Sequence, residues 1–278
     1  MIKALLAIAA TPSLLLAASA AAQDTEARGE PVPAQEASPD KAPIRARLAL
    51  GPQLQPRFPG SNEVFLLPFV DVSITRGDRP FEYEAADQSV SSSLIKSTGF
   101  AFGPAIQLEG SRRRKETDLP VDEVGTSIEA GGFVDVWLGS SIRARGELRK
   151  GVTGHKGLVS DVMLDYVARD GDKWLFSVGP RFTLADRKYQ EAYFGVNPAE
   201  SARTGLPVYA PDGGVHSVGA AATTLYQLDR HWGLYGYAKY DRLVADAADS
   251  PIVRAIGSRN QFSGGVALTF TFNTGIRR

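Results

Sequence analysis

From residue 44 onward, apolar and polar side chains alternate along the chain with a period of two. In the stretch GFAFGPAIQLEG, Phe100, Phe102 and Ile106 share one face, whereas Gln107 and Glu109 lie on the other. A later stretch, QFSGGVALTFTF, alternates in the same way. A period of two is typical of β-strands with one buried face, whereas helices repeat every 3.6 residues. The pattern therefore predicts an all-β fold.

The length of these stretches indicates where the strands lie. Most extend over about ten to thirteen residues, whereas strands of soluble proteins average about five or six. A tilted strand that crosses an outer membrane needs about nine to eleven residues. One face is evenly apolar, and the other carries Gly, Ala, Ser, Thr and charged residues. This favours a transmembrane antiparallel β-barrel over the alternative, a secreted soluble β-sandwich.

Turn signals between the stretches divide the barrel region into twelve predicted strands. They lie near 45–57, 64–75, 80–85, 88–96, 98–110, 126–138, 141–151, 157–169, 173–186, 214–228, 231–245 and 259–272. An even number places both ends in the periplasm, with short periplasmic turns and long outer loops. The pair 80–85 and 88–96 is rich in polar residues. If it forms one irregular piece, the prediction falls to ten strands.

The ends of the chain carry different signals. Residues 1–22 contain one basic residue, an apolar run and small residues, which is the pattern of a secretory signal peptide. Cleavage after Ala20 and cleavage after Ala22 both fit the small residues there. Residues 23–43 are rich in Pro, Glu and Ala without a hydrophobic period, and they predict a flexible segment. The barrel then spans 44–272, and a short tail follows at 273–278.

Composition and charge exclude several classes of function. The formal net charge is zero, so nothing indicates a nucleic-acid partner. The chain has no Cys, which excludes disulfides, iron–sulfur clusters and Cys-based zinc sites. The three His residues lie near predicted loops or turns, and no GxSxG, HExxH or P-loop motif is present. We expect no enzyme, no cofactor and no metal site.

Charged residues of both signs fall on the predicted inner face of three successive strands, 126–138, 141–151 and 157–169. They are Glu129, Asp135, Arg143, Arg145, Glu147, Arg149, Asp161 and Asp165. A hairpin centred on Ser140 places Asp135 opposite Arg145, close enough for the two charges to attract. This charge ladder is interpreted either as a selectivity surface for a charged solute or as a set of ion pairs that fills a small barrel.

The stretch YFGVNPAESARTGLPVYAPDGG interrupts the alternation in the longest predicted outer loop. Asn197 is a good helix N-cap, Pro198 suits the first turn and Glu200 completes a capping box, so a short helix is predicted from Pro198 to about Arg203. We interpret the loop as a lid over the barrel mouth, or alternatively as an exposed loop. The candidate lid residues are Tyr193, Phe194, Gly195, Asn197, Pro198, Glu200 and Arg203.

Three segments of the chain resemble one known family. YFGVNPAESARTGLPVY, RLVADAADSPIV and GSRNQFSGGVALTFTF are similar to the MipA/OmpV family of outer-membrane proteins, the MltA-interacting protein family. The resemblance implies a β-barrel in the Gram-negative outer membrane, in contact with its lipid. The family takes its name from a member that acts as a scaffold for murein-cleaving and murein-synthesising enzymes, so these are the partners it implies.

The resemblance and the residues leave two functions open. One is a non-enzymatic scaffold of this kind, and the other is a narrow or gated pore for small solutes. One departure concerns the end of the chain, because the family usually finishes on a terminal aromatic residue. Here six residues follow Phe272.

Overall fold

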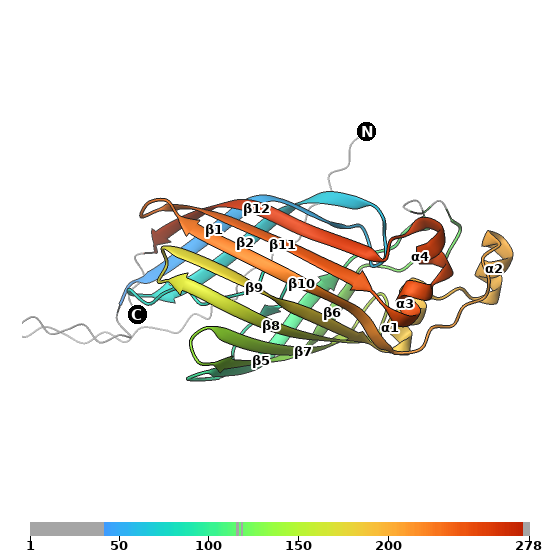
Figure 1. The fold of residues 1–278 in the computed structure, drawn as a ribbon, viewed down its shortest axis with the longest axis horizontal. Coiled ribbons are helices and arrows are strands. Elements are labelled where there is room, and N and C mark those ends of the chain that lie inside the picture. The colour runs from blue at the N-terminus through green and yellow to red at the C-terminus, as the bar shows by residue number, and fades with distance from the viewer. Residues whose placement is uncertain (1–41, 115–116, 118, 275–278) are drawn as a thin grey trace, which may run out of the picture. The chain divides into compact units, whose positions relative to one another are not determined.

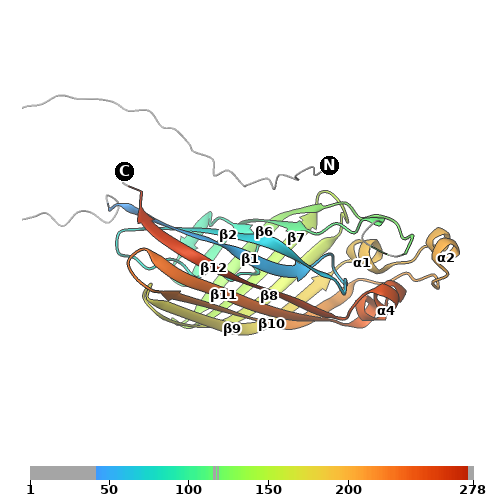
Figure 2. The same ribbon diagram turned by 90° about the horizontal axis from the view of Figure 1, so that it is seen from above.

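The computed structural model describes residues 42–114, 117 and 119–274. The predicted signal peptide, most of the segment 23–43 and most of the tail 273–278 lie outside these residues. Within them the chain forms a curled antiparallel β-sheet with helices at one end (Figures 1 and 2).

The secondary structure follows the predicted alternation over most of its length. The strands are β1 (Ile44–Pro56), β2 (Val64–Arg76), β3 (Val90–Ser91), β4 (Ile95–Ser97), β5 (Phe100–Glu109), β6 (Ser127–Leu138), β7 (Ile142–Gly151), β8 (Leu158–Asp170), β9 (Trp174–Ala185), β10 (Gly214–Gln227), β11 (Trp232–Leu243) and β12 (Asn260–Asn273). The helices are α1 (Arg187–Phe194), α2 (Pro198–Thr204), α3 (Ala245–Asp249) and α4 (Pro251–Ile256). None of the described helices is long and apolar enough to cross a membrane.

From β5 to β12 each strand pairs with the next along the chain, β1 pairs with both β2 and β12, and β2 is an edge strand. The pairing of β1 with β12 curls the wall into an open barrel, and in the described residues no backbone pairing joins its edge strands β2 and β3 (Figure 1). The prediction of a twelve-stranded antiparallel sheet is confirmed. The turns at the end of the barrel where β1 begins and β12 ends are short. One is the β6–β7 turn, where Gly139 has a φ of 72°, a left-handed value that suits glycine.

The prediction for residues 80–96 is partly wrong. The expected strand 88–96 is reduced to the short pieces β3 and β4, which both pair with β5. The expected strand 80–85 does not form, and no backbone pairing joins β2 to β3 or β4 in the described chain. Phe81 and Tyr83, which alternate as the residues of a lipid-facing strand would, are buried instead, and Asp87 binds Arg181 and Lys239.

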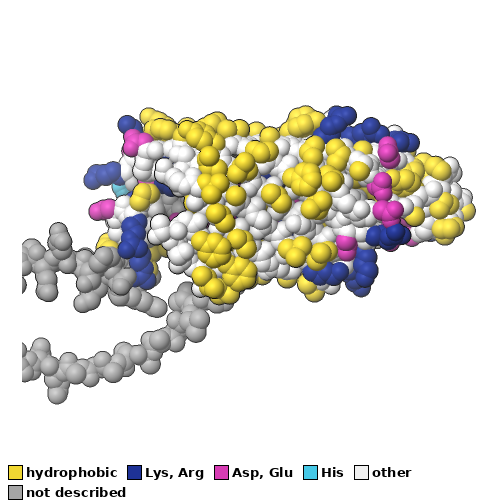
Figure 3. All heavy atoms as spheres, turned by 60° about the horizontal axis from the view of Figure 1, so that its bottom comes forward, with side chains coloured by type: hydrophobic (Ala, Val, Ile, Leu, Met, Phe, Trp, Pro, Cys, Tyr) yellow, Lys and Arg dark blue, Asp and Glu magenta, His cyan; other side chains and the backbone are white. Residues whose placement is uncertain are grey.

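The two faces of the wall differ as a membrane barrel requires. The outward positions carry exposed apolar residues, among them Leu66, Ile74, Leu108 and Val266. Figure 3 shows hydrophobic side chains over the middle of the barrel and charged side chains gathered towards its two ends. At the end with the short turns, exposed outward aromatic residues form a girdle of the kind that marks a membrane interface. These are Phe100, Tyr166, Trp174, Tyr226, Trp232 and Phe272.

A small apolar core lies at the other end, beneath the long outer loops. We call it the outer cap. It consists of buried side chains from α1, α3, α4 and the neighbouring loops and strand ends, with Tyr193, Phe194, Leu243 and Ala247 at its centre. The sequence did not predict α1, α3 or α4. Their aromatic and alanine side chains become buried only because three outer loops come together at the mouth (Figure 2).

Candidate functional site

The barrel interior is lined by the predicted charge ladder. In β7 the sequence RARGELR places Arg143, Arg145, Glu147 and Arg149 at alternate positions, so all four point inward. Each of these four residues is only 2% exposed. Buried charges require partners, because desolvation of an unpaired ion is costly. The neighbouring strands β6 and β8 supply the opposite charges.

Glu147 lies at the centre of the ladder. Its carboxylate accepts from Arg145 Nε at 2.6 Å and also binds Arg149 Nη1. Arg149 extends to Glu129 at 2.9 Å and to Asp161 at 2.6 Å. One carboxylate thus joins two guanidinium groups, and the ladder continues across three strands.

The other half of the ladder is organised by Asp135. The β6–β7 register pairs Asp135 with Arg145, as the hairpin prediction required. The Asp135 carboxylate contacts Arg145 Nη1 and Arg143 Nη2, each at 2.9 Å. Arg143 then approaches Asp165 to 3.9 Å. All eight predicted residues therefore belong to one connected network.

The network extends to residues that the ladder prediction did not include. Arg181 on β9 binds Asp165 at 2.8 Å. Its guanidinium also holds Asp87 through two contacts, Nε to Oδ2 at 2.8 Å and Nη2 to Oδ1 at 3.1 Å. Lys239 on β11 completes the site, 3.4 Å from Asp87 and 3.0 Å from Asp241. Strand alternation also places Arg181, Lys239 and Asp241 on the inner face of the wall. Asp87 could not be found in this way, because the prediction assigns the residues on both sides of it to wall strands.

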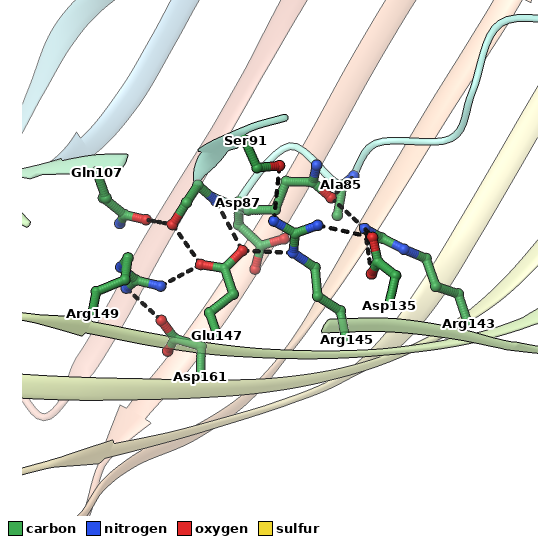
Figure 4. Close-up of polar contacts among 12 residues, drawn as sticks. Ala85, Asp87, Ser91, Gln107, Asp135, Arg143, Arg145, Glu147, Arg149 and Asp161 are labelled. Carbon is green, nitrogen blue, oxygen red and sulfur yellow. Dashed lines mark hydrogen bonds and ion pairs between the residues drawn. The ribbon is translucent and has the colours of Figure 1, made fainter. Parts of the chain in front are cut away.

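Asp87 belongs to a segment that lies inside the barrel. We call residues 81–89 the inward segment. Besides the Asp87 contacts, Phe81 N donates to Asp172 at 2.8 Å, the Tyr83 hydroxyl donates to Ser177 at 2.9 Å, and Ser89 binds Glu147. These partners lie on inward positions of several strands or on a turn beyond them. Figure 4 shows Ala85 and Asp87 facing the ladder residues of β7.

Electrostatics keep the Asp87 contact charged at neutral pH. Burial by itself would raise the pKa of the Asp87 carboxyl, but Lys239 and Arg181 outweigh it and lower the pKa to about 2. The side chain is only 7% exposed, so water screens the contact weakly. Asp87 therefore acts as an ionised latch between the inward segment and the wall.

The predicted lid residues are divided between two helices. Tyr193 and Phe194 lie at the end of α1 and are buried in the outer cap. Buried Arg112 fixes that end, because its guanidinium donates to the carbonyl oxygens of Ala192 and Tyr193. Those carbonyls are among the groups that the end of a helix leaves without partners. The mouth is thus covered by α1, a helix that the sequence analysis did not predict.

The short helix predicted from Pro198 is α2, and it stands beyond the cap (Figure 1). The predicted capping box is present: Asn197 Oδ1 accepts from Glu200 N at 2.9 Å, and Glu200 Oε2 accepts from Asn197 N at 2.8 Å. Gly195 ends α1. The Asp122 carboxylate holds α2 in place by binding the Arg203 guanidinium at 2.7 Å. The hydrogen bonds that Arg203 and Asn197 donate to this carboxylate lower the pKa of Asp122.

Asn197→Ala tests the role of this cap. We expect the change to destabilise α2 by about 1 kcal/mol, the usual cost of losing an N-cap side chain. Amide hydrogen exchange of residues 198–204 should accelerate, while exchange in α1 and the strands stays unchanged. Faster exchange throughout the outer cap would show instead that α2 supports the mouth cover.

Two of the three histidines, His155 and His216, are buried packing residues. His155 Nε2 lies 2.9 Å from Glu129, and the His155 ring packs against Tyr189. A bulge in β10 buries both His216 and Ser217, and the His216 ring packs between Tyr189 and Phe194. In the part of the chain that the structure describes, no group of three or more His, Cys, Asp or Glu side chains is placed to hold a metal.

Comparison with known proteins supports the membrane assignment. The model of the family described as MltA-interacting protein MipA matches residues 48–272. None of the curated proteins compared with the chain matches it.

Three solved structures are similar to parts of the fold. The COG4313 outer membrane channel from Pseudomonas putida F1 has 11% identity and a TM-score of 0.39, over 87% of this chain and 100% of that one. The TodX deltaS2S3 mutant monoaromatic hydrocarbon channel has 9% identity and a TM-score of 0.34, over 86% and 91%. OprG from Pseudomonas aeruginosa has 10% identity and a TM-score of 0.23, over 84% and 98%.

Proposed function

We propose, because the chain belongs to the family of MltA-interacting protein MipA and forms an outer-membrane β-barrel, that it acts without catalysis as a narrow pore, closed in the state described here. The observation that carries this proposal is the inward segment. A barrel that served only as a rigid support could fill its interior with side chains from the wall. Here a separate length of chain occupies the interior.

The attachment of the inward segment suits a gate. It has no β-ladder with the wall and is held through side chains: by the Asp87 latch, by hydrogen bonds, and by the packing of buried Tyr83 and Ala85 against Val167. Glu82 and Glu84 on its other side are exposed. Because these contacts are made by side chains, the segment can leave them without breaking the backbone hydrogen bonds of the wall. Movement of the segment would open a polar path through the barrel.

Asp87→Asn tests this function. The amide keeps the size of the side chain but removes the charge that binds Arg181 and Lys239. In planar bilayers at neutral pH, the wild-type protein should remain closed most of the time. Asp87→Asn, and a variant in which residues 81–89 are replaced by a Gly-Ser sequence of equal length, should conduct for a larger fraction of the time.

The matched control is Asp249→Asn, which removes an exposed carboxylate that binds Arg254 and Arg259 in an outer loop. It should leave conductance unchanged. Heat-modifiable gel mobility shows whether each variant is folded. If folded Asp87→Asn and the Gly-Ser variant are both as closed as the wild type, the pore proposal is wrong.

The family description favours a second candidate, a scaffold that binds a murein-cleaving enzyme such as MltA. The described periplasmic turns offer little surface, since residues 139–141, 171–173 and 228–231 are all that link three of the hairpins. A scaffold would therefore use the barrel rim or residues 23–41. Binding of a purified murein transglycosylase to the full chain and to a chain without residues 23–41 tests this. Absence of binding to the full chain would exclude the scaffold.

A further inference from the structure

The lipid-facing wall has a recess near its outer end, where β11, β12, β1 and β2 lie side by side. Its volume is about 530 Å³, and most of the residues that line it are apolar or glycine. Leu54, Leu66, Phe262 and Val266 form its sides, and Gly264 lies between them. The recess is separate from the ladder and the inward segment.

The sequence explains why the wall is hollow at this point. Gly264 occupies an outward position of β12, and its register partners are Ala238 on β11 and Leu54 on β1. Gly264 has no side chain and its neighbour Ala238 has a single methyl group, whereas the other outward residues around Gly264 are larger. An unfilled recess would forfeit dispersion contacts, so in the membrane an acyl chain should occupy it.

A polar group stands at the outer end of this recess. The Phe262 ring packs against Tyr240 at 4.9 Å, and the Tyr240 hydroxyl donates to Asn260 Oδ1 at 2.8 Å. Arg242 Nη1 donates to the same oxygen at 2.9 Å. The Arg242 side chain is exposed and on an outward position. Its guanidinium has a planar array of donors that suits the two oxygens of a phosphate.

The spacing of the two features matches one lipid molecule. Arg242 pairs with Asn260, and Ala238 pairs with Gly264, four residues nearer the bilayer centre. At about 3.3 Å per residue this separates the cation from the floor of the recess by roughly 13 Å. A headgroup phosphate at Arg242 therefore allows an acyl chain to reach the recess.

We propose that the recess and Arg242 form a site for an acylated, phosphorylated glycolipid of the outer leaflet. Charge complementarity and position select this occupant. The cation lies at the end of the barrel with the long loops, and the recess opens to lipid in the same half of the membrane. This site is independent of conduction through the lumen.

Native mass spectrometry of the full chain in neutral detergent tests the site, with bis-phosphorylated lipid A as the probe. We expect one retained lipid on the wild type. Arg242→Gln should lower its affinity by about tenfold, the loss of one charge-assisted contact. Ala238→Phe, which adds a ring beside the recess at the register partner of Gly264, should also weaken binding. Dephosphorylated lipid A should bind the wild type as weakly as lipid A binds Arg242→Gln.

Matched controls lie on β7, away from the recess. Lys150 is an exposed outward cation at the outer end of that strand, and Ala144 is an outward alanine nearer its middle. Lys150→Gln and Ala144→Phe should leave binding unchanged. Equal losses from Lys150→Gln and Arg242→Gln, an unchanged affinity in Ala238→Phe, or equally strong retention of phosphatidylglycerol would each overturn the proposal.

Discussion

Glu147→Ala should destabilise the barrel by about 3–5 kcal/mol, the cost of leaving buried charges without their partner. The Glu147 side chain is fully buried and binds Arg145, Arg149 and Ser89. Without it, two guanidinium groups remain in the same interior with one carboxylate fewer. The free energy of unfolding in lipid vesicles, measured by urea titration and followed by heat-modifiable gel mobility, reports this cost.

Two variants separate the buried network from a general effect of charge removal. Glu63→Ala removes the exposed partner of Arg57, and it should cost less than about 1 kcal/mol. Glu147→Gln keeps an acceptor oxygen and the shape of the side chain, so its cost should fall between the two alanine variants. If Glu147→Ala is as mild as Glu63→Ala, the ladder contributes little to folding, and its interpretation as a selectivity surface gains support.

The parts of this fold that the sequence predicts well are those in which local pattern and membrane agree. A strand with lipid on one side must be apolar at every second position, so the alternation in β5 or β12 defines both the strand and its facing. The hairpin register follows from the short turn, which is why the pairing of Asp135 with Arg145 could be predicted. The eight ladder residues then follow from parity alone.

The inward segment lies beyond the reach of that argument. Residues 81–85 alternate as a strand does, and the alternation does not show whether their partner is a neighbouring strand or the inside of the barrel. The decision depends on Asp87, whose partners Arg181 and Lys239 are 94 and 152 positions away in the sequence. The helices of the outer cap present the same difficulty. Tyr193 and Ala247 lie in different outer loops and are buried in the same apolar core. That core can form only once the barrel has brought the two loops together.

Leu268→Arg should cost about 2–4 kcal/mol, the price of an arginine on the lipid face near the bilayer midplane. Leu268 points outward from the inner half of β12 and is 47% exposed. A guanidinium at this position meets hydrocarbon and can reach water only by displacing lipid or stretching towards an interface. Urea titration of protein folded in vesicles measures the loss of unfolding free energy. Removing the arginine at position 242, near the outer interface, should change that free energy far less.

The control for Leu268→Arg must face the lumen without overpacking it. Ala267 faces inward but is packed against Ala49 and Phe69, so an arginine there would cause a steric loss unrelated to lipid. Gln53 on β1 is the better choice, because its side chain is long, half-buried and hydrogen-bonded to Tyr237 on the lumen side. Gln53→Arg should cost clearly less than Leu268→Arg. Equal costs would mean that the outward face of β12 does not contact lipid, and the membrane placement of this wall would then be wrong.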